Sequence, residues 1–136
     1  MGGSPESVLG AHPAWNLAAC DMDAGGSWSF CKERLLDDFW DVILPKLQQF
    51  ESMTWGDIFV VAKKQNHSNE LESLNKCARD RLEELRIEAE AIKSLRIGGK
   101  LRIYGFMVGP VYNILWYDND HGDNDTCVCR AHKKHT

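Results

Sequence analysis

The chain has 136 residues and a formal net charge of −4, with 43% hydrophobic and 26% charged residues. This composition is that of an ordinary globular protein and argues against a disordered chain. No apolar run reaches the ~20 residues that a membrane span requires, so we expect no membrane contact. The cysteines are odd in number, five in all, which argues against a disulfide-rich secreted protein and leads us to expect a cytoplasmic one.

The charge is unevenly distributed along the chain. Residues 1–92 contain 9 Lys or Arg against 16 Asp or Glu, whereas residues 93–136 contain 7 against 4. A basic end on an acidic body favours a phosphate-bearing partner at that end. The overall acidity argues against a protein that coats nucleic acid generally.

The first 27 residues predict a flexible arm. The stretches "MGGSPES" and "DAGGS" are rich in Gly, Ser and Pro, and no apolar period develops between them. We therefore expect an arm over 1–27 and a single domain over 28–136, with no strand ahead of its helices.

Helices are predicted over about 30–92. Apolar residues recur every three or four positions from Leu35 to Phe50, and Pro45 predicts a kink near Leu44. The stretch "TWGD" at 54–57 matches a capping box and predicts a short helix after it. A polar loop, "KKQNHSN", is expected before the second helical period. The buried face of that second helix is predicted to contain Leu71, Leu74, Ala78, Leu82 and Leu85.

After Lys93 the apolar period changes from helical to alternating, which predicts strands. Gly98-Gly99 predicts a hairpin turn, "VYNILWYD" predicts a third strand, and "TCVCR" is a candidate fourth. The sequence thus predicts an α+β domain, with N-terminal helices packed on a C-terminal antiparallel β-meander of three to four strands over about 94–130.

The hairpin and the strand after it resemble a known family. The stretches "SLRIGGKLRIYGF" and "VYNILWYD" are similar to the C-terminal half of the RelE/ParE-like toxins of bacterial toxin–antitoxin pairs. In that family a strand reading roughly Gly-x-x-Arg-hydrophobic-Tyr carries a functional arginine, which corresponds to Arg102 within 99–104. The resemblance covers 94–136 best and 54–136 more loosely. Two features depart from it, because the family usually begins with a strand and is usually strongly basic.

The resemblance implies an activity and two partners. It implies a metal-independent endoribonuclease without a cofactor, which cleaves RNA, with messenger RNA, free or on the ribosome, as the expected substrate. The implied protein partner is a small antitoxin that neutralises the toxin and covers the basic face of the sheet.

The chemistry of RNA cleavage indicates which residues would act. The phosphate needs charge stabilisation, which the planar guanidinium of Arg102 can supply, with Arg96 and Lys100 assisting. Arg96 and Arg102 flank Gly98-Gly99 almost symmetrically, so we expect them close to a cross-strand pair. The alternative is that both arginines are solvent-exposed residues on the polar face of the sheet and have no binding role.

Most candidates for proton transfer and for further RNA contacts lie in the C-terminal part of the sequence. Histidine is the usual proton-transfer group near neutral pH, and tyrosine is a weaker candidate. Alternation predicts that Leu115 and Tyr117 share one face of the third strand, with Trp116 on the other. The catalytic candidates besides Arg102 are His121, His132, His135 and Tyr104, and the RNA-binding candidates besides Arg96 and Lys100 are Tyr117, Arg130, Lys133 and Lys134.

Two other functions remain open from the sequence. One is a non-catalytic protein-interaction module that uses an acidic helical surface. The other is a small zinc-binding domain with Cys127, Cys129, His132 and His135 as ligands. The Cys-x-Cys spacing is shorter than the Cys-x₂₋₄-Cys of zinc sites, so we expect no metal.

Overall fold

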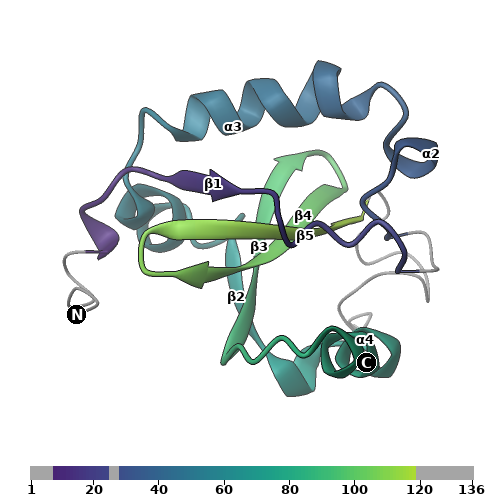
Figure 1. Cartoon of the computed structure of the whole chain (residues 1–136). Helices are drawn as coiled ribbons and strands as arrows, with labels where there is room; N and C mark the ends of the chain where they lie inside the picture. Colours follow the sequence, from purple (N-terminus) through teal and green to yellow (C-terminus); the bar gives the residue numbers. More distant parts are fainter. Residues whose placement is uncertain (1–7, 25–27, 119–136) are drawn as a thin grey trace, which may run out of the picture.

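The computed structural model describes residues 8–24 and 28–118, which form a five-stranded sheet with helices on both sides (Figure 1). The strands lie in the order β1-β5-β4-β3-β2. Their bounds are β1 Ala14–Asn16, β2 His67–Glu70, β3 Ala91–Gly98, β4 Leu101–Val108 and β5 Val111–Asp118.

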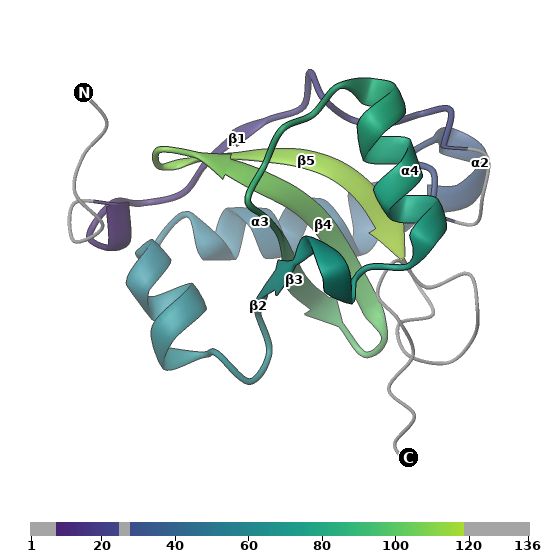
Figure 2. The same ribbon diagram turned by 90° about the horizontal axis from the view of Figure 1, so that it is seen from below.

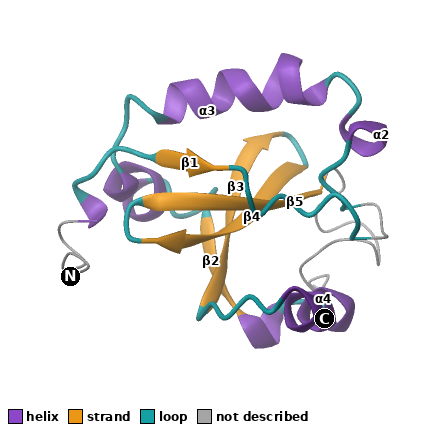
Figure 3. Ribbon diagram, viewed as in Figure 1, coloured by secondary structure: helices purple, strands orange, loops and turns teal. Residues whose placement is uncertain are grey.

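The helices divide between the two faces of the sheet (Figures 1 and 3). One face is covered by α2 (Lys32–Leu35), a π-helical turn (Phe39–Ile43) and α3 (Leu44–Phe50), and a second π-helical turn (Asp57–Val61) adds Ile58 to the same core. The other face is covered by α4 (Lys76–Leu85), which follows a 3₁₀ turn (Leu71–Ser73). Figure 2 shows α4 in front of the sheet and α3 behind it.

Each face has its own buried core. On the α3 side, Ile43, Leu47, Trp55 and Ile58 pack against Ile103 and other strand residues. On the α4 side, Leu74, Ala78 and Leu82 pack with Trp28 and Trp116, and Leu71 and Leu85 are partly buried beside them. The predicted face residues are confirmed as buried or partly buried, but the helix covers only Lys76–Leu85. Leu71 and Leu74 lie ahead of it, in and just after the 3₁₀ turn.

The α+β class is confirmed, but the predicted arrangement is wrong in two respects. Strands β2 to β5 are antiparallel, whereas β1 runs parallel to β5, so the sheet is mixed. The helices lie between β1 and β3 in the chain instead of ahead of every strand. The polar loop also contains β2, which is an exposed edge strand and therefore shows no apolar alternation.

The expected absence of a strand ahead of the helices is wrong. Trp15 in β1 packs its ring against Phe50, Trp55 and Tyr112, and its Nε1 donates to Glu51 Oε2 at 2.8 Å. These partners are distant in sequence, and a three-residue strand is too short to show a period. Residues 14–16 thus belong to the sheet, although they fall within the predicted arm of 1–27.

The capping box before the second helix is confirmed, whereas Pro45 does not break its helix. The π-helical turn Phe39–Ile43 runs directly into α3 with helical backbone at Ile43 and Leu44, so the predicted kink is seen only as a change of hydrogen bonding from π to α. In the capping box, the Asp57 amide donates to Thr54 Oγ1 at 3.2 Å and the Thr54 amide donates to Asp57 Oδ2 at 3.0 Å.

The hairpin at Gly98-Gly99 is also confirmed, with Gly99 at a φ of 54°. The prediction that Leu115 and Tyr117 share a face is wrong, because the register shifts between Tyr104 and Gly105 and leaves Leu115 as an extra residue. Leu115 and Trp116 consequently pack on the α4 side, and Tyr117 packs on the α3 side.

Gly105 lies where β4 has no room for a side chain beside β5. A Cβ at this position would lie 2.1 Å from the Asn113 carbonyl oxygen and 2.7 Å from the Tyr112 ring. With no side chain at 105, the buried Tyr112 hydroxyl reaches across β4 and donates to the Lys93 carbonyl oxygen at 2.7 Å. Tyr112 therefore ties β5 to β3 over the intervening strand.

Candidate functional site

The β3–β4 hairpin brings three of the predicted cationic residues together. Arg96 is the direct register partner of Arg102, which confirms the predicted cross-strand pair. Lys100 lies in the turn between them and is exposed. We call Arg96, Lys100 and Arg102 the basic hairpin.

Alternation along the strands places both arginines on the α4 side of the sheet. The neighbours of Arg96, Leu95 and Ile97, belong to the core on the α3 side, as do the two neighbours of Arg102. Since successive strand side chains point to opposite faces, the two arginines point towards the face that α4 covers. Arg96 is exposed there and Arg102 is half-buried.

Hydrogen bonds fix the backbone and one side chain of the basic hairpin. The buried Asn66 accepts from the Arg96 amide at 2.9 Å and donates to the Ile58 carbonyl oxygen at 3.1 Å. The Arg102 Nη1 donates to the carbonyl oxygens of Gly99 at 2.7 Å and Leu101 at 3.2 Å. The Arg102 guanidinium is therefore folded over its own turn, which fixes the orientation of its plane.

The last residue of β5, Asp118, lies directly opposite Arg102 in the register and is buried. Neither a strand pattern nor a motif in the sequence had singled out this carboxylate. Its position places a negative group beside the predicted phosphate-binding arginine. A ligand at the basic hairpin would thus meet Arg96 and Lys100 as its exposed cations.

The two predicted tyrosines do not lie at this surface. Tyr104 is fully buried in the core on the α4 side, and Tyr117 is fully buried on the α3 side, where its hydroxyl donates to Asp38 Oδ2. The predicted catalytic role of Tyr104 and the predicted stacking role of Tyr117 therefore find no support in the geometry. Both side chains serve the cores instead, because large aromatic residues contribute most there.

The remaining predicted residues lie outside the described part of the chain. They are His121, Arg130, His132, Lys133, Lys134 and His135, together with the zinc candidates Cys127 and Cys129. Within 8–24 and 28–118, no group of three or more His, Cys, Asp or Glu side chains could hold a metal ion. No helix in that same part of the chain is long and apolar enough to cross a membrane.

A buried ion pair on the α4 side was missed by the sequence analysis. The buried Asp21 carboxylate accepts from Arg81 Nε and Nη2, each at 2.8 Å, and from Trp116 Nε1 at 2.9 Å. The partners lie 60 and 95 residues from Asp21 in the chain, so no local pattern could have revealed them. Burial alone would raise the pKa of this carboxyl, but the bonds from Arg81, Trp116 and the Asp23 amide hold it below its usual value.

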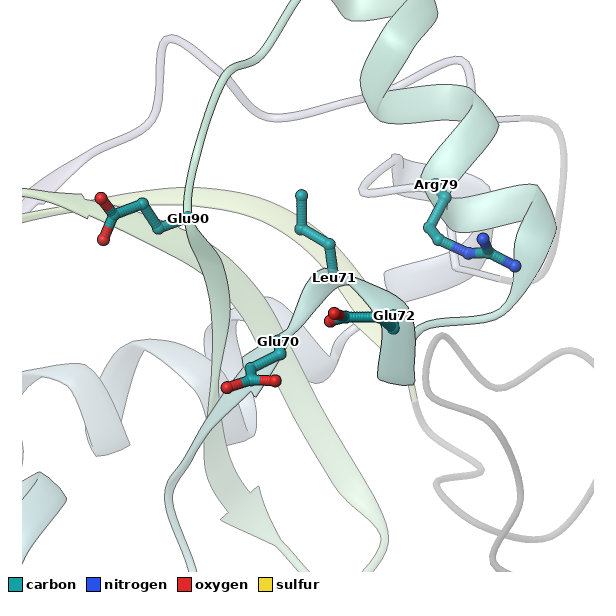
Figure 4. A pocket seen from close by; sticks show the side chains of 5 residues that line it. All are labelled: Glu70, Leu71, Glu72, Arg79 and Glu90. Carbon is teal, nitrogen blue, oxygen red and sulfur yellow. The ribbon is translucent and has the colours of Figure 1, made fainter.

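A hollow of about 540 Å³ lies beside α4 and is shown in Figure 4. Glu70, Glu72 and Glu90 line it together with Leu71 and Arg79. Figure 4 shows the carboxylate of Glu72 pointing away from the guanidinium of Arg79. The three carboxylates are spread around the hollow and do not converge on one point.

Lys93 is a titratable residue that the sequence analysis did not consider. Its Nζ lies 5.0 Å from the centroid of the Phe59 ring on the α3 side of the sheet. Burial lowers the pKa of this lysine, while the ring face offers its charge a partner. This arrangement accounts for Lys93 as a packing contact between β3 and the second π-helical turn.

An apolar groove of about 370 Å³ lies between α2 and the segment after β1. Its walls come from residues 17–22 and 30–40, and Lys32 is its one charged lining residue. Burial raises the pKa of the Cys20 thiol to about 11, so this residue remains a neutral thiol near pH 7. The walls of the groove are therefore mostly uncharged.

No protein-family model matches this chain, and comparison with curated proteins and with solved structures gave no significant match. The function must therefore be argued from the described residues.

Proposed function

We propose that this protein is a RelE-like toxin, a metal-independent endoribonuclease that contacts the RNA phosphate with its basic hairpin. The observation that carries the proposal is the cross-strand pairing of Arg96 with Arg102, beside the exposed Lys100. Arg96 and Lys100 are exposed cations of this hairpin, and the half-buried Arg102 lies beside Arg96 in the register. Arginine is suited to this contact because its charge is permanent and its fork donates parallel hydrogen bonds.

The order of elements supports the same family. The resemblance implies a strand ahead of the helices, and β1 occupies that position although the sequence did not predict it. The helices then precede the meander of β3, β4 and β5, with the arginine of the family motif, Arg102, on β4. This agreement in element order supports the proposal independently of the motif.

The proposed chemistry is attack of a 2′-hydroxyl on the neighbouring phosphorus, with departure of the 5′ oxygen. The basic hairpin would stabilise the charge that develops on the phosphate oxygens. Tyr104 is buried and takes no part, so the proton transfers fall to His121, His132 or His135. A small antitoxin protein would neutralise the toxin by covering the same cations.

Induced expression in a bacterial host tests the proposal. Wild type should arrest growth and produce new RNA 5′ ends by primer extension, and Arg102→Ala should abolish both while remaining folded. Arg34→Ala is the matched control, since Arg34 is an exposed arginine on α2, across the sheet from the basic hairpin. Normal growth and intact RNA at high soluble expression of wild type would contradict the proposal and favour the interaction-module alternative.

Binding of a labelled single-stranded RNA oligonucleotide separates RNA contact from cleavage. Each lost phosphate contact should lower the slope of log affinity against log salt by about 0.7 for single strands. We expect this reduction for Arg96→Ala, measured by fluorescence anisotropy, and none for Arg34→Ala. Equal slopes for both variants would show that Arg96 does not contact phosphate.

A further inference from the structure

The strand β2 leaves one edge of the sheet open. The strand order ends with β2, which pairs with β3 on its inner side (Figure 2). Its four residues, His67–Glu70, include no large apolar side chain, and three of them are exposed. An exposed edge presents a row of backbone groups that can pair with another strand.

Two hydrogen bonds of β3 show which backbone groups of β2 face outwards. The Lys93 carbonyl oxygen accepts from the Tyr112 hydroxyl, on the β4 side. The Arg96 amide donates to Asn66 Oδ1, on the β2 side. Because the backbone groups of successive residues in an antiparallel pair point alternately towards the partner strand and away from it, Lys93 does not bond to β2. Ser68, its register partner, therefore directs its amide and carbonyl away from β3, to the open edge.

Glu70, two residues further along, faces the same way as Ser68. Its carbonyl oxygen accepts from the Ser73 hydroxyl at 2.7 Å and has room for a second bond. In the described part of the chain, no other hydrogen bond reaches the outward amides and carbonyl oxygens of Ser68 and Glu70. The open edge thus offers two donors and two acceptors to a strand from outside.

The charges along this segment have opposite signs at its two ends. Residues 62–67 contain Lys63 and Lys64 and no acid, whereas residues 69–73 contain Glu70 and Glu72 and no Lys or Arg. All four of these side chains are exposed. One end of the β2 edge is therefore basic and the other is acidic.

The hollow of Figure 4 keeps the acidic sign of the second end. Glu90 joins Glu70 and Glu72 around it, and Arg79 is its one basic lining residue. In the part of the chain that the structure describes, none of these three carboxylates forms an ion pair. They are consequently available to basic side chains of another molecule.

A second copy of this chain complements both the backbone groups and the charges. When two β2 strands pair antiparallel about a two-fold axis, the basic end of each copy lies opposite the acidic end of the other. Ser68 of one copy then lies opposite Glu70 of the other, and their outward amides and carbonyls pair. Parallel pairing would instead place like charges together and be repelled. Since the contact uses the β2 edge of both copies, assembly stops at two.

We propose that this protein forms a two-fold symmetric homodimer in which the β2 edges pair antiparallel and join the two sheets into one. Lys63 and Lys64 of each copy contact the carboxylates of Glu70 and Glu72 of the other. A contact centred on a four-residue strand is small, so the dimer is weak and forms at high micromolar concentration. The inference does not depend on RNA cleavage.

Sedimentation velocity of the full chain over a range of concentrations tests the dimer. The mean mass should rise from monomer towards dimer with concentration, and less steeply as salt is added. Reversing the charges of one end, by Lys63→Glu/Lys64→Glu or by Glu70→Lys/Glu72→Lys, should weaken dimerisation at least about tenfold. Each reversal places like charges opposite each other at both symmetric contacts.

The two charge-reversed variants should dimerise with each other. The first is acidic at both ends of the edge and the second is basic at both, so the mixture restores opposite charges at each contact. Recovery of dimer in the mixture also shows that both variants are folded. Lys32→Glu/Arg34→Glu is the matched control, because it reverses two exposed cations on α2 and should leave the dimer intact.

Amide hydrogen exchange identifies the surface that pairs. The outward amides of Ser68 and Glu70 should exchange quickly in dilute solution and slowly once the dimer forms. The amides of His67 and Asn69, which face β3, should change little with concentration.

Three results would overturn the inference. They are a chain that stays monomeric at its highest soluble concentration, a dimer that survives reversal of either end, and a dimer that leaves the Ser68 and Glu70 amides unprotected. The first would leave the β2 edge to an extended strand of another protein, and the other two would assign dimerisation to a different surface.

Discussion

Arg81 and Arg96 lie on the same side of the sheet, yet the structure gives them different surroundings. Arg81 binds both oxygens of a buried carboxylate, Asp21, and also reaches Glu84 at 2.9 Å. Arg96 is exposed and, in the described part of the chain, forms no ion pair. The difference shows that an arginine on this face is structural where a buried carboxylate meets it, and is available to an external anion where none does.

The sheet, which carries Arg96 and packs against α4, should be least tolerant at Gly105. A Cβ would collide with the Asn113 carbonyl oxygen at 2.1 Å, so Gly105→Ala must separate β4 from β5 or displace Tyr112. We expect a loss of about 3–5 kcal/mol in the free energy of unfolding, the range of severe core changes. Urea unfolding followed by circular dichroism measures it, with Gly98→Ala as the control, since its Cβ would meet only Val42 Cγ1 at 3.9 Å.

A stable Gly105→Ala protein with native spectra would contradict the close approach of the two strands. It would also show that the Tyr112 ring does not need the space at position 105 for its hydroxyl to reach the Lys93 carbonyl oxygen.

The contrast between the two arginines predicts unequal losses of stability when each is removed. Arg81→Ala leaves the buried Asp21 carboxylate without its ion-pair partner and should cost about 2–4 kcal/mol of unfolding free energy. Arg96→Ala removes an exposed side chain and should cost less than about 0.5 kcal/mol. Urea titration of both variants gives these values, and equal losses would show that the contrast between the two arginines is wrong.

The pH dependence of stability should report the same ion pair. Hydrogen bonds hold the pKa of Asp21 below its unfolded value, so the unfolded chain takes up more protons in acid. The stabilisation is present above the unfolded pKa of about 3.9 and is lost as the pH falls through the lower folded value. Asp21→Asn should therefore be less stable than wild type at pH 7, and the gap should narrow below pH ~4.

Unfolding free energies at several pH values compare the two proteins. A gap that stays constant from neutral pH into acid would mean that the Asp21 carboxylate is not the titrating group.

Local patterns predicted the parts of the fold that local interactions determine. The capping box, the hairpin and the Arg96–Arg102 pair all follow from residues close together in the chain. What the sequence did not reveal depends on distant partners. β1 is recognised only through β5, and the bulge at Leu115 exists only because β4 sets the register.

The candidate binding residues divide in the same way. The basic hairpin could be predicted because its three cations lie within seven positions. Tyr104 was predicted as a proton-transfer candidate and Tyr117 as an RNA contact, and both predictions need a side chain that reaches solvent. Here helices cover both faces, so tyrosines on either side are buried. The apolar groove could not be found from sequence, since residues 17–22 meet α2 only in the folded chain.

The pairing of β1 with β5 has a consequence for the order in which the chain folds. Ala14 is the register partner of Val111, and Asn16 is the register partner of Asn113. β1 can therefore join the sheet only after β5 has been synthesised. Strands β3 to β5 can form in sequence through tight turns, but the N-terminal strand closes a loop of nearly the whole domain. During synthesis Trp15 leaves the ribosome long before its partner Tyr112, and it is exposed to other chains until the final strand has emerged.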